Sequence, residues 1–338
     1  MRKLIKQIIP SKYHVYYKVI KKKWFIVFEI VLSPLTIISC YWLKLCKRKL
    51  YVSPFTKSIF DFTGVFPILD HYYEPLYNKK HLRKSLREDR NIVSLDFNDA
   101  EQIKLIDKFS YNDELLAFPR KRTSNPLEFS YNYGDYPSGD SESLYNMMRT
   151  IKPKRMIEVG CGSSTLMAIN AMKMNKKENE NYDCEYTCIE PYEQPWLEKT
   201  GLKVLRKKVE DVPLDFFKTL AENDILFIDS SHMIRPQGDV LYEILEILPA
   251  LNSGVIIHFH DICTPKDYFD EWVGKFMWNE QYILEAFLSN NKEYEIILST
   301  NYLLHHHYEK FISKCPVLKF DKEQNPIRET GAFWIRKK

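Results

Sequence analysis

The stretch MIEVGCGSST, residues 156–165, constrains the fold of this 338-residue chain more than any other. Its apolar first half predicts a short strand that runs into a tight turn at Gly160 and Gly162. Glycine lets the backbone turn sharply there and lets a ligand approach it closely. Ser163 and Ser164 are good N-cap residues, and the helix that they open favours anionic groups at its N-terminus. The stretch therefore predicts a strand, a turn and a helix that hold a nucleotide-like ligand.

The turn does not match the dinucleotide-binding fingerprint. That fingerprint requires a third glycine where this chain has Thr165. Glu158, two residues before Gly160, is not part of the fingerprint either. A carboxylate at the end of the strand suits a ligand that carries a positively charged group, such as an amino acid moiety.

Composition argues against several classes of protein. The formal net charge is +4, which is too small for a chain that binds nucleic acid through its overall charge. The seven cysteines are odd in number and have no CxxC spacing, which argues against a disulfide framework and against a zinc site. We therefore expect a reducing compartment, with most of the cysteines acting as small core residues.

The first fifty residues differ in character from the rest of the chain. Basic residues without any acidic residue among them occupy its beginning: Arg2, Lys3, Lys6, Lys12, Lys18 and Lys21–Lys23. An apolar run extends from Trp24 to Leu43, and four more basic residues follow it: Lys44, Lys47, Arg48 and Lys49. We expect residues 1–50 to form a basic, hydrophobic segment that associates with a membrane.

The placement of charge argues against a simple membrane span. Glu29 and Pro34 interrupt the run, and a single span with the rest of the chain in the cytoplasm would put the first basic flank outside. Two basic flanks instead favour a segment that is kinked at Pro34 and enters and leaves on one face, or that lies in the interface. We expect a cytoplasmic protein attached to the inner face of the membrane through residues 24–43. A helical arm packed on the protein or on a second copy of the chain is the alternative, and the lack of a small-residue cleavage site argues against a signal peptide.

Residues 51–124 predict an aromatic and helical cap region. The segment 70–74, DHYYE, is either part of a carbohydrate site or a packed aromatic loop. The apolar pattern of residues 98–118 predicts a helix, and a second helix is expected from Asp140 to Arg149 with Asp140 as its N-cap. Tyr131, Tyr133 and Asp140 lie just before the first strand, where they could face a ligand.

Several predicted strands end on acidic or histidine side chains. Glu158 and Glu190 belong to the first two strands, Asp229 and His232 follow the fourth, and His260 and Asp261 end the fifth. In open α/β sheets the ligand site lies outside the carboxyl ends of the strands, so these side chains are expected to converge. Glu190 has the position at which a carboxylate accepts both ribose hydroxyls. His258 lies inside an apolar strand and is read as a core residue.

The remaining strands complete an α/β fold. Residues 203–205 predict a short third strand, 294–300 a sixth, and 331–337 a seventh. The expected fold is Rossmann-like, with a seven-stranded, mostly parallel sheet and an antiparallel last strand, in which the last two strands form a hairpin-like pair. The run His305–His307 is given no role, because consecutive helical positions do not face one metal ion.

With these motifs placed, the chain resembles bacterial class I S-adenosylmethionine (SAM) methyltransferases, the group that includes sugar and macrolide-sugar O-methyltransferases found near polysaccharide genes. The segments that carry the resemblance are IEVGCGSST, CIEPYEQPWL, LFIDSSHMIRPQGDV, IIHFHDI and FMWNEQYILEAFL. They imply a methyltransferase domain over residues 125–338.

The resemblance also implies roles for individual residues. Glu158, Gly160, Gly162 and Ser163 would hold the methionine part of SAM, Glu190 its ribose, and Glu210 or Asp211 its adenine. His260 is the first choice of general base and His232 the second, since histidine suits proton abstraction near neutral pH. Asp229 is also expected among the cofactor-binding residues, and Asp261 among the catalytic ones. Some relatives bind Mg²⁺ through acids that match Asp229 and Asp261. This chain has His260 where relatives often have a second acid, and the competing role of Asp229 and Asp261 is to orient the histidines.

Three hypotheses about function remain open at this stage. The first is an O-methyltransferase that acts on a small molecule, a sugar, a glycan or a lipid-linked saccharide, with no nucleic acid partner. The second is an N-methyltransferase of a small molecule. The third is a membrane-associated SAM-binding scaffold without turnover, against which the complete set of acidic motifs argues.

Overall fold

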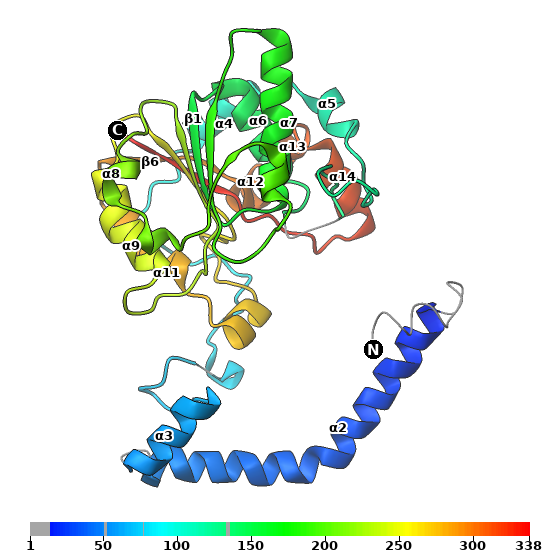
Figure 1. The fold of residues 1–338 in the computed structure, drawn as a ribbon, viewed down its shortest axis with the longest axis vertical. Coiled ribbons are helices and arrows are strands. Elements are labelled where there is room, and N and C mark those ends of the chain that lie inside the picture. Colours follow the sequence, from blue (N-terminus) through cyan, green and yellow to red (C-terminus); the bar gives the residue numbers. More distant parts are fainter. Residues whose placement is uncertain (1–13, 51–52, 77, 133–135) are drawn as a thin grey trace. The chain divides into compact units, whose positions relative to one another are not determined.

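The chain divides into two compact units, Met1–Leu82 and Arg83–Lys338 (Figure 1). The computed structural model describes residues 14–50, 53–76, 78–132 and 136–338, with side chains from Lys23 onward. The basic residues predicted ahead of Lys23 therefore lie outside the side chains that the structure describes.

The first unit is a series of helices joined by turns: α2 (His14–Leu45), η2 (Cys46–Leu50), α3 (Pro54–Thr63) and η3 (Lys79–His81). Most apolar side chains of α2 are exposed from Trp24 onward, and Lys23–Leu50 is long and apolar enough to cross a membrane. In the segment 70–74, Asp70 forms ion pairs with Lys80 and His81, while both tyrosines are exposed. This segment is a surface loop of the first unit.

The second unit is built on a seven-stranded sheet with the order β3-β2-β1-β4-β5-β7-β6. Its strands are β1 (Arg155–Val159), β2 (Glu185–Ile189), β3 (Lys203–Leu205), β4 (Ile225–Ile228), β5 (Ile256–Phe259), β6 (Tyr294–Ser299) and β7 (Phe333–Lys337). The first five strands are parallel, and β7 pairs antiparallel with both β5 and β6. The predicted Rossmann-like fold with an antiparallel last strand is confirmed.

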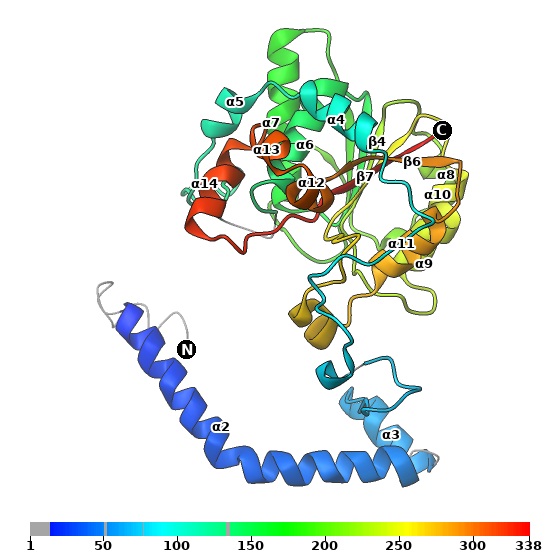
Figure 2. The same ribbon diagram turned by 180° about the vertical axis from the view of Figure 1, so that it is seen from behind.

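Helices cover both faces of the sheet (Figures 1 and 2). The helices that pack with one face are α4 (Asp99–Asp107), α5 (Asn112–Leu116), α6 (Asp140–Ile151), α7 (Ser163–Glu178), α12 (Thr300–His306), α13 (Tyr308–Ile312) and α14 (Pro316–Gln324). Those that pack with the other face are α8 (Leu214–Phe217), the continuous segments α9 (Asp239–Tyr242), η6 (Glu243–Ile247) and α10 (Leu248–Ala250), and α11 (Glu280–Leu288). Short helical turns complete the loops: η4 (Leu197–Thr200), η5 (Val209–Asp211) and η7 (Trp272–Phe276). Each layer buries its own apolar cluster against the sheet.

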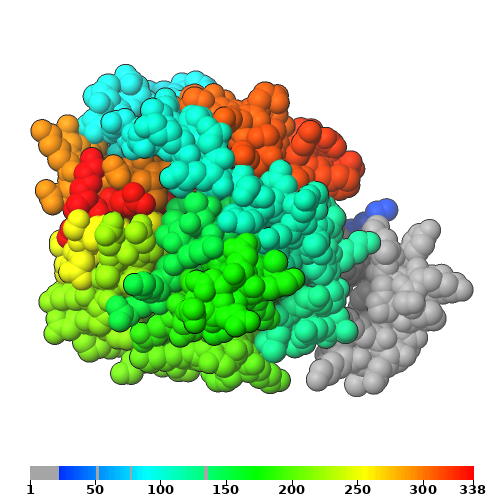
Figure 3. Space-filling model, turned by 90° about the horizontal axis from the view of Figure 1, so that it is seen from above, coloured from blue at the N-terminus to red at the C-terminus, as the bar shows by residue number. Residues whose placement is uncertain are grey.

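Two sequence predictions differ from the structure. The helix expected over residues 98–118 is two helices, α4 and α5, separated by the turn 108–111. The last two strands do not form a hairpin, because α12, α13 and α14 lie between them in sequence. Figure 3 shows these helices, in orange to red, beside the cyan segment of α4 and α5, consistent with contacts between α4 and β6 and between α5 and α14.

Candidate active site

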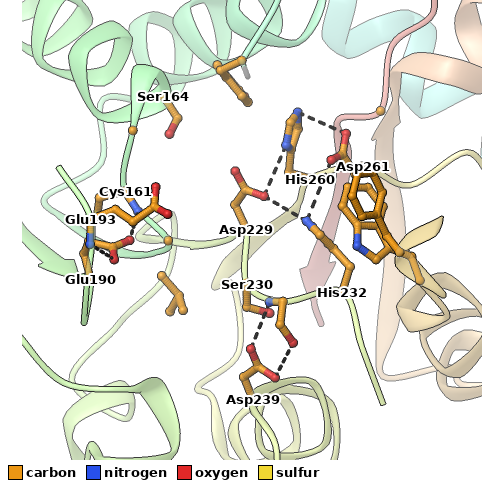
Figure 4. Close-up of a pocket in the computed structure, with 18 of the residues that line it drawn as sticks. Cys161, Ser164, Glu190, Glu193, Asp229, Ser230, His232, Asp239, His260 and Asp261 are labelled. Atoms are coloured by element: carbon orange, nitrogen blue, oxygen red, sulfur yellow. Dashed lines mark hydrogen bonds and ion pairs between the residues drawn. The ribbon is translucent and has the colours of Figure 1, made fainter. Parts of the chain in front are cut away.

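A cavity of about 1520 Å³ lies at the carboxyl ends of the parallel strands. Loops after β1, β2, β4 and β5 line it, together with the start of α6 and the segments 269–278 and 325–331. All lining residues belong to the second unit. The convergence expected from a parallel sheet is therefore present, and most of the predicted site residues meet here (Figure 4).

The glycine turn forms one wall of the cavity. Gly160 has φ +77°, and a Cβ there would lie 1.8 Å from the carbonyl oxygen of Asp229, so no other residue fits. Gly162 has no neighbour within 4 Å of the position of a Cβ, and it lines the cavity with Ser163 and Ser164. Gly160 therefore permits the close approach of the turn after β1 to the end of β4, and Gly162 leaves room for a ligand.

Glu158 lies beneath this turn and not in the cavity wall. Its carboxylate is buried and accepts hydrogen bonds from Ser164 Oγ and Thr165 Oγ1, each at 2.6 Å, and from the hydroxyl of Tyr186. The Thr165 hydroxyl also accepts a hydrogen bond from the backbone N–H of Gly162 at 3.1 Å. The sequence predicted that Glu158 contacts the methionine part of a cofactor. In the structure its carboxylate instead accepts hydrogen bonds from side chains of the protein. The same contacts give Thr165 a structural role at the position of the missing third glycine.

Burial raises the pKa of the Glu158 carboxyl from 4.5 to about 7, although the hydroxyls of Ser164, Thr165 and Tyr186 oppose the shift. Because the folded-state pKa lies above the unfolded value, the free energy of unfolding should be highest below about pH 4.5. It should fall by up to about 3 kcal/mol as the pH rises through 7, at 1.36 kcal/mol per pKa unit. Denaturant unfolding of the wild type and of Glu158→Gln at pH 5 and pH 8 measures this change. The free energy of unfolding of the variant should fall much less between the two pH values than that of the wild type. Parallel pH curves for the two proteins would contradict the assignment.

Glu190 lies at the end of β2 and lines the cavity, as predicted. Its Oε2 accepts a hydrogen bond from the backbone N–H of Cys161 at 3.3 Å, and its Oε1 accepts from those of Tyr192 and Glu193 at 2.9 Å each. These bonds fix the carboxylate beside the glycine turn. Glu210 also lines the cavity, whereas Asp211 is not among its lining residues.

A cluster of histidines and aspartates forms the opposite wall (Figure 4). The Asp229 Oδ1 atom lies 3.3 Å from His232 Nε2 and 3.4 Å from His260 Nδ1. The Asp261 carboxylate lies 3.8 Å from His232 Nε2 and 3.7 Å from His260 Nε2. Both histidine rings are buried, and all four residues were predicted to converge from the ends of β4 and β5.

The pKa values in the cluster follow from burial and from this mutual contact. Burial acts to raise the pKa of Asp229, but the two histidines hold it well below its ordinary value. Burial acts to lower the pKa of His260 and of His232, yet the surrounding carboxylates raise both. Burial raises the pKa of Asp261 to about 6, against the effect of the histidines. The four side chains are therefore electrostatically coupled, with the aspartates favouring the charged form of the histidines.

Two further acidic residues lie at the site: Glu280, which the sequence did not assign to it, and Asp140, for which an N-cap and a position facing a ligand were the two expectations. Glu280, the first residue of α11, is buried, and its Oε2 lies 2.7 Å from His232 Nδ1. Asp140 is not the N-cap of α6, which is Gly139. Its carboxylate accepts hydrogen bonds from the backbone N–H groups of Gly331 and Ala332 at 2.9 and 2.8 Å and lies 3.8 Å from His260 Nε2.

Other predicted candidates lie elsewhere. Tyr131 is buried in the core and donates its hydroxyl to the carbonyl of Leu115. Tyr133 lies outside the described residues. His258 is fully buried between Phe227 and Trp334, as a core residue. The three consecutive histidines contact three different acids: His305 contacts Glu329, His306 contacts Asp89 and His307 contacts Asp99. They have no common ligand geometry.

The donor set of Asp229, His260 and Asp261 fits a divalent cation. One ligand atom from each lies within 4.8 Å of the others. His260 Nε2 is buried without a hydrogen-bond partner among the described residues, which leaves it available. Two carboxylates with one imidazole suit Mn²⁺, Fe²⁺ or Zn²⁺ better than the predicted Mg²⁺, which prefers oxygen ligands alone.

Comparison with known proteins places these features in a family. Residues 157–262 match a family described as a methyltransferase domain. An uncharacterized protein from Archaeoglobus fulgidus is 30% identical over 167 residues, which are 46% of this chain and 74% of that protein.

Two solved structures are also similar. One is a putative protein-L-isoaspartate O-methyltransferase from Plasmodium falciparum in complex with S-adenosyl-L-homocysteine, 17% identical with a TM-score of 0.24, over 50% of this chain and 78% of that one. The other is the plantazolicin methyltransferase in complex with SAH, 13% identical with a TM-score of 0.32, over 71% of this chain and 98% of that one. The strand order and the family match, and not these low scores, carry the assignment. The second unit therefore has the fold of class I methyltransferases, and its residues 157–262 match a methyltransferase domain.

Proposed function

We propose that the protein transfers the methyl group of SAM to a hydroxyl of a sugar, a glycan or a lipid-linked saccharide. The observation that carries this proposal is that the glycine turn and the histidine–aspartate cluster line one cavity from opposite sides. A cofactor held by the turn and a hydroxyl held by the cluster would meet between them.

The turn side offers the groups that SAM needs. The N-terminus of the 16-residue helix α7 suits the carboxylate of the methionine part. The Glu190 carboxylate, already oriented by three backbone N–H groups, can accept hydrogen bonds from the two ribose hydroxyls. Glu210 lines the same side, where it can accept a hydrogen bond from the adenine amino group. The negative charge of the site also favours the positively charged sulfonium.

The cluster side offers a proton acceptor. The hydroxyl oxygen attacks the methyl carbon in line with the bond to sulfur, that bond breaks, and the neutral thioether leaves. The hydroxyl proton goes to a histidine. We assign this role to His232, because Glu280 holds its Nδ1 and leaves Nε2 directed at the cluster. The surrounding carboxylates raise the pKa of His232, so only the fraction of molecules with a neutral ring accepts the proton, and kcat should rise with pH. His260 was the first choice from sequence, but its position in the donor set favours a role as a metal ligand.

A divalent cation held by Asp229, His260 and Asp261 would polarise the acceptor hydroxyl and make its proton easier to remove. In the absence of that ion, the same two aspartates orient the histidines. In both cases the protein residues set the position of the acceptor relative to the methyl group.

The aromatic segment after β5 supports a saccharide acceptor. Phe269, Trp272 and Trp278 line the cavity, and the Trp278 ring lies 4.3 Å from the His232 ring. Partly exposed aromatic rings give apolar faces on which a sugar ring can pack while its hydroxyls reach polar groups. A hydroxyl of such a ring would lie close to the proposed base.

Calorimetric titration of SAM tests the cofactor assignment. Glu190→Gln should bind SAM about tenfold more weakly, because a charged hydrogen-bond acceptor is replaced by a neutral one. Glu185→Gln is the matched control, since Glu185 is at the exposed start of the same strand and pairs with Arg155. Equal affinities in the two variants would contradict the role of Glu190, and no binding by the folded wild type would overturn the methyltransferase proposal.

Release of S-adenosylhomocysteine tests the acceptor class. The wild type would be assayed with monosaccharides, nucleoside-diphosphate sugars and primary amines, each with EDTA and with added Mn²⁺ or Mg²⁺. Turnover with a saccharide supports the proposal. Turnover with the amines alone would identify an N-methyltransferase, and SAM binding without turnover on any acceptor would favour a scaffold.

A further inference from the structure

Helix α3 has an apolar face that no other described part of the first unit covers. Phe55, Ile59 and Phe62 are 76%, 45% and 92% exposed. Their spacing of i, i+4 and i+7 places them on one side of the helix, while Lys57 and Asp61 lie on the opposite side. Such a helix suits an interface between an apolar and an aqueous phase.

Cations lie immediately before this helix. Lys44, Arg48 and Lys49 are exposed, and Lys47 pairs with Glu74. No acidic residue occurs between Glu29 and Asp61. Cations next to an apolar surface attract a membrane with anionic headgroups, at about 1 kcal/mol for each cation near the surface.

Helix α2 has its proline at the middle of the apolar run 24–43, and Figure 1 shows the helix bent. Pro34 has no N–H, so the carbonyl of Ile30 loses its usual helical donor. The Ser33 hydroxyl donates a hydrogen bond to that carbonyl at 2.8 Å. The carbonyl of Ile30 therefore keeps a hydrogen-bond donor within the helix, as an apolar surrounding requires. Each ten-residue arm is about 15 Å long, half of the hydrocarbon thickness of about 30 Å.

From these observations we infer that residues 23–50 and 53–66 form a one-sided anchor for an anionic lipid surface. Helix α2 enters one leaflet, bends at Pro34 and returns, while α3 lies in the headgroup region with Phe55, Ile59 and Phe62 in the acyl chains. Trp24 and Trp42, at the two ends of the run, lie at the headgroup level. The anchor does not depend on methyl transfer.

Charge favours lipid over a second copy of the chain as the occupant of these surfaces. Pairing two copies through α3 would bring two clusters of the same cations together, at a cost in repulsion. An anionic membrane instead meets the cations and the apolar face at once. It also accommodates α2, whose apolar side chains are exposed on all sides.

Cysteine labelling in sealed, inside-out membrane vesicles from cells that express the full chain tests the anchor. A cysteine is introduced at Phe62 or Asp61 in a Cys40→Ser background, in which the other six cysteines are buried, and the protein is treated with a membrane-impermeant maleimide. Phe62 lies on the apolar face of α3, and Asp61, about 100° away around the helix, lies on its polar side, so each is the matched control for the other. Phe62→Cys should react at least about tenfold more slowly than Asp61→Cys, because its thiol lies in lipid. Equal rates would overturn the placement of α3.

The same assay determines the path of α2. Lys23→Cys and Lys49→Cys should both react without detergent, from the same side as Glu309→Cys in the second unit. Reaction of only one of the two before detergent would show a membrane span and overturn the one-sided anchor. Slow labelling of Phe62→Cys in the absence of vesicles, together with a dimer in size-exclusion chromatography, would show that a second copy of the chain covers this face. That result would overturn the proposal of a lipid surface.

Discussion

Replacement of His232 by alanine is expected to lower kcat by about 10²- to 10⁴-fold, the contribution typical of a positioned general base. SAM affinity should be unchanged, because His232 lies on the cluster side of the cavity, across from the glycine turn. Steady-state rates and calorimetric titration of the same preparation separate the two effects. Glu280→Gln should also lower kcat, but less, because it weakens the bond that fixes the His232 ring without removing the base.

Two further variants make this prediction specific. His307→Ala is the control, since His307 is at the surface and contacts Asp99. His260→Ala should lose bound metal as well as activity, measured by metal analysis of the purified protein. A His232→Ala variant with normal kcat would contradict the assignment, and loss of turnover in His260→Ala with full metal content would return the role of base to His260.

Replacement of Gly160 by alanine is expected to prevent folding of the second unit. The new methyl group would lie 1.8 Å from the carbonyl oxygen of Asp229, and φ +77° disfavours alanine in addition. The turn cannot move away, because the backbone N–H of Gly160 donates to Ile189 and that of Asp229 donates to Val159. We expect a loss of more than about 4 kcal/mol, at the upper end of the effects of single substitutions.

Gly162→Ala is the matched comparison. Its Cβ would meet nothing within 4 Å, and φ −169° is open to any residue, so the cost should be about 1 kcal/mol or less. The methyl group would enter the cavity, so SAM affinity should fall while thermal unfolding changes little. Thermal unfolding and soluble yield of the two variants measure the difference, and equal stability would contradict the role given to Gly160.

The sequence was most informative where topology determines the outcome. Asp229, His232, His260 and Asp261 follow parallel strands, and parallel strands bring their carboxyl ends to one edge. Glu190 was placed by the same rule. These residues could be brought together from the sequence without knowledge of any side-chain contact.

The sequence was less informative where side-chain direction or distant packing decides. Glu158 alternates along β1 with Ile157 and Val159, whose cluster is on the other face, so its side chain points under α7. That alternation was a usable signal. No signal in the sequence indicated the role of Glu280, because its contact with His232 joins residues 48 positions apart through the packing of α11. Asp140 was read locally as an N-cap, whereas its partners are in the segment just before β7.

The position of β7 has a consequence for synthesis of the protein on the ribosome. In the sheet β7 lies between β5 and β6, yet it follows β6 in sequence after three helices. While the chain is being translated, β5 therefore has an open edge and β6 has no strand beside it until residues 333–337 have emerged. Such an edge is a site for non-native strand pairing. The nascent second unit should thus depend on chaperones that bind extended apolar segments until its last strand is inserted.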